Sequence, residues 1–241
     1  MPMVNKSQIE KLICCRDFPY LQPYFYNHPY ALRCELGMGD SDEEYMATAE
    51  SRALEIYKLL FPEGADAVFF NYWVNDYSDS CEAERALYGE DAESIIENRI
   101  RMEVEQLLFL SHYQVCYRHV AVRDLPTYDE PGDPDYGKNR RNRIVCFADD
   151  KHFDYMDIIR RQIEGVGSHG IGFVSFKHEC ILSIYDDRGC DIVFAVPEKM
   201  REFYPLLKPY FLAYDLEEME RRYLAQALYD PDTTVPETAN A

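Results

Sequence analysis

Residues 181–196 read ILSIYDDRGCDIVFAV, two short apolar runs on either side of the polar turn DDRG at 186–189. Aspartate accepts backbone hydrogen bonds at the start of a tight turn, and glycine adopts the positive φ with which such turns often end. We therefore predict a β-hairpin with strands at 181–185 and 191–196. A further apolar run precedes it at 171–176, so three consecutive strands are expected in this part of the chain.

Helical patterns alternate with strand-like runs in the rest of the chain. Ser41 and Glu44 have the S-x-x-E spacing of a helix cap, and apolar residues then recur every three or four positions until Pro62. Further helices are expected after Asp91, over 153–163, from Pro197 to about 207 and after Asp215, and further strands over 24–36, 67–74, 113–122 and 143–148. These segments predict an α+β fold: a mixed, largely antiparallel sheet with flanking helices, and a C-terminal β-hairpin followed by two helices.

The length of the chain suits a single domain. We expect one α+β domain at 31–229, after an N-terminal segment at 1–30 and before a frayed tail at 230–241. Within the domain, residues 125–142 contain three prolines and two glycines among many charged residues. This composition is typical of a loop, so we predict an exposed loop over 125–142.

The composition excludes a disordered chain and disfavours polyanionic partners. Hydrophobic residues make up 47% of the 241 residues, whereas the net charge is −19. Nucleic acids and anionic lipids are bound through clusters of Lys and Arg, so this charge argues against both. A basic protein partner fits the charge better.

The cysteines and the apolar runs indicate the compartment. The first 20 residues are interrupted by charges, and no run approaches the roughly 20 apolar residues of a membrane span. The eight cysteines form no C-x-x-C pair and have no regular spacing, whereas disulfide frameworks are typical of short secreted chains. We therefore expect a cytoplasmic protein with reduced thiols.

The hairpin and the tyrosines after it form a recognisable combination. The segment 184–191 reads IYDDRGCD, Phe203–Tyr204, Pro209–Tyr210 and Tyr214–Asp215 follow it, and R-x-E-L-G stands upstream at 33–37. This combination resembles the bacterial domain-of-unknown-function family DUF3885, whose signature is Y-D-D-R-G-x-D. The resemblance extends over about 31–223 and implies a bacterial cytosolic α+β protein, without implying an activity.

The charged residues of the hairpin are the first candidate site. Closely spaced carboxylates could bind a cation or exchange protons, and Arg33 and Glu35 would strengthen such a site if the fold brings them close. The alternative is structural, because Asp and Gly are the ordinary residues of tight turns and Arg188 can pair with a nearby acid. The candidate ligand-binding residues are Arg33, Glu35, Asp186, Asp187, Arg188 and Asp191.

Acidic residues are concentrated between Asp40 and Asn98, where the net charge is −13. Such charges usually lie on solvated helix faces, but beside aromatic residues they could also form a docking face for a basic protein. The candidate partner-binding residues are Trp73, Tyr77, Glu82, Glu84, Glu90 and Glu93. The stretch 138–161 has a local net charge of +3. It could pair with the acidic part, within the monomer or across a homodimer, or contact nucleic acid, which the overall charge disfavours.

The sequence contains no recognised motif for catalysis, a metal or a cofactor. The six histidines are dispersed, and the glycines at 165–172 lack the pattern of a nucleotide-binding loop. We therefore predict no catalytic residue, metal ligand or cofactor, and a non-enzymatic protein-interaction module of an immunity-like or regulatory kind. The alternative is a ligand-binding or metal-binding protein, or an enzyme, with its site at the Asp186–Asp187–Arg188 hairpin.

Overall fold

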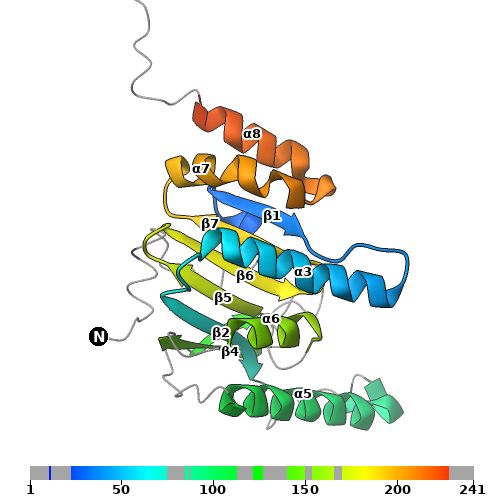
Figure 1. Cartoon of the computed structure of the whole chain (residues 1–241). Helices are drawn as coiled ribbons and strands as arrows, with labels where there is room; N and C mark the ends of the chain where they lie inside the picture. Colours follow the sequence, from blue (N-terminus) through cyan, green and yellow to red (C-terminus); the bar gives the residue numbers. More distant parts are fainter. Residues whose placement is uncertain are drawn as a thin grey trace, which may run out of the picture.

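A computed structural model describes residues 11, 23–74, 85–86, 88–112, 122–126, 140–149, 154–165 and 170–227. These residues contain a seven-stranded sheet in the order β1-β7-β6-β5-β2-β4-β3, in which every neighbouring pair is antiparallel. The strands are β1 (Ala31–Glu35), β2 (Ala67–Val74), β3 (Val122–Pro126), β4 (Arg140–Asp149), β5 (Gly170–Ser175), β6 (Cys180–Asp186) and β7 (Gly189–Phe194). Helices flank this sheet, which confirms the expected α+β class (Figure 1).

Two helices cover one face of the sheet, α2 packs against the face that carries Arg33 and Asp191, and other helices lie beyond the edges. In Figure 1, α3 and α6 cross the face turned to the viewer, α5 lies beyond β2 and β4, and α7 and α8 lie beyond β1. The helices are α2 (Tyr24–Asn27), α3 (Asp42–Leu60), α5 (Ala92–His112), α6 (Tyr155–Ile163), α7 (Pro197–Leu207) and α8 (Leu216–Ala227), with the 3-10 helices η2 (Gly89–Asp91), η3 (Lys208–Tyr210) and η4 (Ala213–Asp215). The predicted hairpin is therefore present as β6 and β7, and two α-helices follow it.

The cap predicted for α3 is present. The Ser41 side chain accepts a hydrogen bond from the Glu44 backbone N–H at 3.2 Å, and the Glu44 carboxylate accepts one from the Asp40 N–H at 3.2 Å. The first bond satisfies a donor that the first turn of a helix leaves unpaired, and the second ties the residue before the cap to that turn. The helix ends before Pro62, as the sequence predicts.

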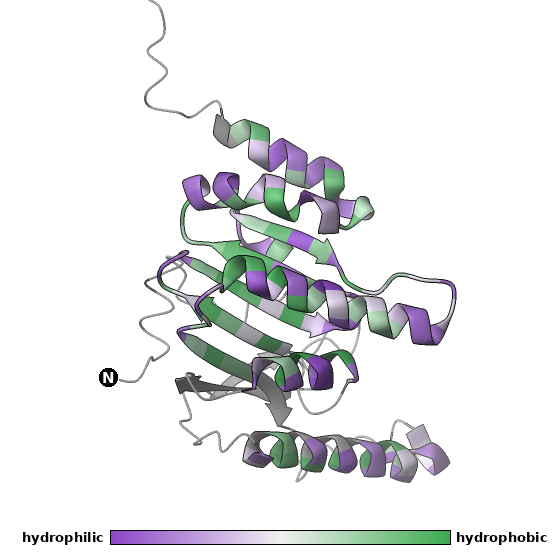
Figure 2. Cartoon of the chain, in the orientation of Figure 1, coloured by the Kyte–Doolittle hydropathy of each residue, from purple (hydrophilic) through white to green (hydrophobic). Residues whose placement is uncertain are grey.

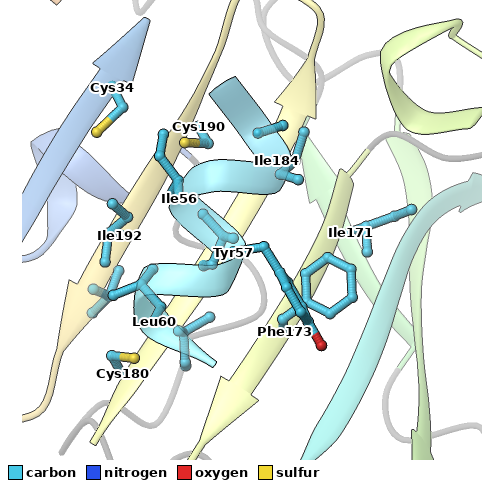
Figure 3. Packing of buried hydrophobic residues seen from close by; sticks show 14 of the residues in the cluster. Cys34, Ile56, Tyr57, Leu60, Ile171, Phe173, Cys180, Ile184, Cys190 and Ile192 are labelled. Atoms are coloured by element: carbon cyan, nitrogen blue, oxygen red, sulfur yellow. The ribbon is translucent and has the colours of Figure 1, made fainter. Parts of the chain in front are cut away.

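The main core lies between α3, α6 and the sheet. The ring of Tyr57 on α3 packs edge-on against Phe173 of β5, with 4.9 Å between ring centroids. Three cysteines that the sequence places in or beside strands, Cys34, Cys180 and Cys190, are fully buried, and Cys34 lies opposite Cys190 in the register (Figure 3). These thiols act as small apolar side chains in the core.

The outer edge of β1 is covered by the C-terminal part of the chain. The Leu212 N–H donates to the Arg33 carbonyl at 3.2 Å, and the Arg33 N–H donates to the Met219 sulfur on α8 at 3.3 Å. An isolated bridge also joins Cys34 to Phe211. These contacts satisfy backbone groups that an open sheet edge would leave exposed to other chains.

The segment 24–36 was expected as one strand, and this expectation is wrong for its first part. Residues 24–27 form the helical turn α2, closed by a hydrogen bond of 2.9 Å from the His28 N–H to the Tyr24 carbonyl. Arg222 of α8 donates to the carbonyls of Phe25 and His28, at 2.7 and 3.1 Å. These tertiary contacts stabilise a helical turn in an aromatic run whose intrinsic preference favours a strand.

The stretch 125–142, expected as a loop, begins and ends in strands. Strand β3 continues to Pro126, β4 begins at Arg140, and these two residues are paired, so the backbone groups are satisfied by pairing rather than by water. The rest of that stretch, 127–139, lies outside the described residues. So do nearly all of the strand expected at 113–122, most of the N-terminal segment at 1–30, and the tail at 230–241.

Candidate functional site

The tip of the β6–β7 hairpin is held by contacts between its own charged residues. The Asp186 carboxylate accepts hydrogen bonds of 2.9 Å from the Arg188 backbone N–H and from its Nε. The first bond is the aspartate turn that the sequence predicts. The Arg188 side chain is 74% exposed, so the ion pair lies at the surface of the molecule.

The glycine and the tyrosine of the signature Y-D-D-R-G-x-D fit against each other. A Cβ atom on Gly189 would lie 2.1 Å from the Tyr185 hydroxyl oxygen and 2.7 Å from the Cys34 carbonyl oxygen. No side chain can therefore replace the glycine hydrogen without a shift of the neighbouring backbone. Burial raises the pKa of Tyr185, so this hydroxyl stays protonated at neutral pH.

Arg33 and Asp191 form a buried ion pair between β1 and β7. The Arg33 Nε lies 2.8 Å from Asp191 Oδ1, and its Nη2 lies 3.1 Å from Oδ2. The Asp191 carboxylate also accepts the Phe25 N–H at 3.1 Å, and only 1% of its side-chain surface is exposed. Burial by itself would lower the pKa of Arg33, but the bond to Asp191 raises it above its ordinary value, so the guanidinium remains charged.

A second carboxylate joins this pair. Asp215, at the end of η4, lies 3.6 Å from Arg33 Nη1 and accepts the Tyr26 hydroxyl at 3.1 Å. The guanidinium also lies over the Tyr26 ring, 4.6 Å from its centroid. We name Arg33, Asp191, Asp215 and Tyr26 the buried ion network. It joins three motif segments that are far apart in the sequence, and its contacts are those of a structural network.

The carboxylates of Glu35 and Asp187 are not engaged by the charged residues around them. Both are half-buried, and neither side-chain carboxylate makes a hydrogen bond or an ion pair with the residues that the structure describes. Both lie near Tyr45 of α3, whose pKa is raised by burial and by the negative charges of Asp187 and Asp186. Across the described ranges, no group of three or more His, Cys, Asp or Glu side chains comes together in a way that could hold a metal. The open carboxylates could attract a cationic group but do not form a metal cage.

The structure describes three of the six predicted partner-binding residues. Trp73 lies in β2, where its backbone pairs with Arg143 of β4. Glu90 lies in η2 and Glu93 in the first turn of α5, where Arg85 pairs with Glu93 at 2.7 Å. Tyr77, Glu82 and Glu84 lie outside the described residues.

Helix α5 exposes a row of large apolar side chains. Its inner side is anchored by Phe109, which packs on Phe70 of β2 with 5.8 Å between ring centroids. The exposed members are Ile100 at 46%, Val104 at 48%, Leu107 at 45% and Leu108 at 64%. Figure 2 shows apolar and polar positions side by side along this helix. The sequence pattern predicts a helix here but does not indicate that this row of its apolar residues is exposed. The adjacent leucines at 107–108 make the apolar arc of the helix wider than contact with the sheet alone requires. This width is the feature of the sequence that could have indicated an exposed apolar row.

Glu93 and Glu97 continue this row towards the start of the helix. The positions 93, 97, 100, 104 and 107 follow one another at steps of three or four residues, and 108 lies four residues after 104, so these side chains share one side of the helix. Glu93 and Glu97 are both exposed. We name Glu93, Glu97, Ile100, Val104, Leu107 and Leu108 the α5 face: acidic in its first half and apolar in its second.

Two surface depressions lie away from the hairpin tip. One of about 430 Å³ is lined by Tyr26, Asn27, His28, Pro29, Glu218, Arg221, Arg222 and Ala225. The other, of about 630 Å³, lies between the end of α3 and the β5–β6 turn. Neither is lined by the residues predicted as a ligand site, and the sequence gives no motif for either.

These elements define an α+β protein with an antiparallel sheet. Strands β1 and β7, the first and last in the chain and neighbours in the sheet, are joined by the buried ion network. The chain belongs to the family described as Domain of unknown function (DUF3885), because the model of that family matches residues 13–215. In comparisons with the curated proteins and with the solved structures, nothing matched. No helix in the described part of the chain is both long enough and apolar enough to span a membrane.

Proposed function

We propose that this protein is a non-enzymatic interaction module of bacterial cytoplasm, and that the α5 face binds a basic protein partner. The observation that carries the proposal is the exposed row of Ile100, Val104, Leu107 and Leu108. Scattered apolar side chains are normal on a surface, but a contiguous row is typical of an interaction site. The proposed partner is neutralised or regulated by the contact.

The charge beside the row supports a basic partner. Glu93 and Glu97 lie on the α5 face, and Glu90 and Asp91 precede them in η2. Complementary charge accelerates encounter and discriminates against wrong partners, while buried apolar anchors supply most of the affinity. Trp73, Tyr77, Glu82 and Glu84, from the same acidic stretch of sequence, remain candidate partner-binding residues on the ground of the sequence alone.

The hairpin is less well supported as a site for a ligand or a metal. Asp186 is engaged by Arg188, and Asp191 by Arg33, so a ligand would have to displace these contacts. Glu35 and Asp187 are the members that a ligand could reach without doing so.

Matched single substitutions can test the docking surface. Leu107→Asp changes the α5 face, and Leu206→Asp makes the same change at an equally exposed leucine on α7. Glu97→Lys reverses a charge on the α5 face, and Glu217→Lys reverses one on α8. All four sites are exposed, so the midpoints of urea unfolding should stay close to that of the unchanged protein.

Proteins captured from a bacterial lysate would be identified, made recombinantly and titrated against each variant by calorimetry at low and high salt. We expect Leu107→Asp to weaken binding about tenfold or more, and Glu97→Lys to weaken it with a smaller salt dependence. The two control variants should bind within about twofold of the unchanged protein. Equal binding by all variants would contradict the proposal. A dimer seen by light scattering, and dissociated by Leu107→Asp, would assign the face to a second copy instead.

A further inference from the structure

The α5 face has the residue spacing of a coiled coil. Its members Glu93, Glu97, Ile100, Val104 and Leu107 are separated by steps of four, three, four and three residues. This alternation averages about 3.5 residues and defines positions a and d of a heptad, which contact a second helix that winds along the first. We name these five residues the heptad row. Their spacing fits a helical partner better than a loop or a strand.

A second helix has room along the heptad row. All five of its residues are exposed, whereas Ala92 and Phe109 on the other side of α5 are buried. In Figure 1, no labelled helix or strand lies beyond α5 on the side away from the sheet. The row is about 21 Å long from the rise per residue of an α-helix, so one helix can contact its whole length.

Glu97 lies within the row without a cation. Its carboxylate makes no hydrogen bond or ion pair with the residues that the structure describes. The cations closest in the sequence are already engaged: Arg85 pairs with Glu93 at 2.7 Å, and the Arg101 Nε lies 4.0 Å from a carboxylate oxygen of Glu105. A carboxylate that a partner covers needs a cation, because burial of an unpaired charge is unfavourable. A charged residue at position a also fixes the register of the two helices.

A second copy of α5 does not supply this cation. The heptad row contains no Lys or Arg, so a second α5 cannot place a cation directly opposite Glu97 in any register. A parallel pair would place the two Glu97 carboxylates side by side, and each copy carries a net charge of −19. The charges of the row therefore favour a different, basic chain over a homodimer.

The helix dipole selects the direction of the partner. Its basic residues lie beside Glu97, in the N-terminal half of α5. In an antiparallel pair these residues belong to the C-terminal end of the partner helix, where the dipole favours cations. In a parallel pair they belong to its N-terminal end, where the dipole disfavours them. The antiparallel arrangement is therefore the more stable one.

We infer that the partner binds the α5 face with one amphipathic helix, which packs antiparallel to α5 and carries Lys or Arg after its apolar heptad positions. The apolar side chains of that helix cover Ile100, Val104 and Leu107, and its cation bonds to Glu97. This inference rests on the proposed function, because it names the element with which a basic partner contacts the α5 face.

Two synthetic peptides of about three heptads, with equal composition and capped ends, test the helix and its direction. The first has Leu at positions a and d of its first two heptads and Lys at those of the last, with Ala and Gln elsewhere. The second has the heptad with Lys at the start. Each is titrated into the full chain by calorimetry, and circular dichroism of the mixture is compared with the sum of the components. We expect the first peptide to bind, to gain helical signal and to bind about threefold or more tighter than the second.

Matched charge reversals on α5 test the contact with Glu97. Glu97→Lys should weaken binding of the first peptide about fivefold or more, and a peptide with Glu in place of its Lys should bind this variant better than it binds the unchanged protein. Glu105→Lys makes the same change at an exposed position of α5 outside the heptad row, and should leave binding within about twofold. Val104→Asp should remove binding of both peptides.

Absence of peptide binding at millimolar concentration, or binding without a gain of helical signal, would overturn the inference. The proposed function would still stand if a protein captured from the lysate bound the unchanged chain and lost affinity for Leu107→Asp. Equal or tighter binding of the second peptide would overturn the antiparallel direction. Equal effects of Glu97→Lys and Glu105→Lys would overturn the role of Glu97.

Discussion

Arg33 is the cation of the buried ion network, so its replacement should strongly lower the stability of the fold. Arg33→Met would leave the buried carboxylates of Asp191 and Asp215 without their cation, and we expect it to lower the free energy of unfolding by about 3–5 kcal/mol. Arg33→Met/Asp191→Leu removes both charges of the pair and should be less destabilising than the sum of the single changes. Urea unfolding of the four proteins of this double-mutant cycle measures the difference.

Arg188→Met is the control, because this arginine belongs to an exposed ion pair. Arg188→Met should lower the free energy of unfolding by only about 0–1 kcal/mol. If Arg188→Met proves as destabilising as Arg33→Met, the burial of the Arg33 pair is not what makes it important.

Glu218 on α8 predicts a dependence of stability on pH. Arg221 and Arg222 bond its carboxylate and lower its pKa from 4.5 to about 2. Because the folded state favours the ionised form, this contribution to stability is complete above pH 4.5 and is lost as the pH falls towards 2. Glu218→Gln should therefore be less stable than the unchanged protein at pH 7, and the difference should shrink at pH 3. Unfolding midpoints in urea at several pH values would test this, with Glu217→Gln as control; a difference that is constant with pH would contradict it.

At the scale of elements, strands β2 and β5 are joined by a close contact. A Cβ atom on Gly172 would lie 1.8–2.5 Å from three ring atoms of Phe69. We expect Gly172→Ala to destabilise the protein by about 1–3 kcal/mol, because the ring has to move within a packed core. Gly172→Ala/Phe69→Leu should be less destabilising than the sum of its parts in chemical unfolding. Additive effects would show that the strain does not come from this ring.

Elements with local signals could be predicted from the sequence, and elements fixed by tertiary contacts could not. The cap at Ser41 and the turn at Asp186–Gly189 depend on neighbouring residues, so their patterns predict α3 and the hairpin. Helix α2 depends on Arg222, which lies almost 200 residues away, and no local pattern indicates it. The exposure of Leu107 depends on what packs against α5, which the spacing of apolar residues does not specify.

The candidate sites follow the same division. Asp191 is a candidate because it belongs to the hairpin, whereas Arg33 is one only if the fold brings it close. The register of β1 with β7 decides that the two residues pair with each other.

For the whole molecule, the sequence predicts the class but not the order of strands. Antiparallel neighbours such as β5, β6 and β7 follow one another in the chain, and short connections make their pairing predictable. Strands β2 and β5 are neighbours across a long insertion, and β1 pairs with β7 at the opposite end of the chain. Preferences of single strands do not select among such distant partners.

The pairing of β1 with β7 has a consequence for synthesis. Arg33 and Asp191 are 158 residues apart, so β1 emerges from the ribosome long before its partner. At roughly 5–20 residues per second, β1 waits about 8–30 s for β7. During that time its apolar residues Leu32 and Cys34 have no sheet to join. A nascent chain of this protein therefore passes through a period in which β1 is a natural target for chaperones, and folding of the sheet can finish only once nearly the entire domain has been made.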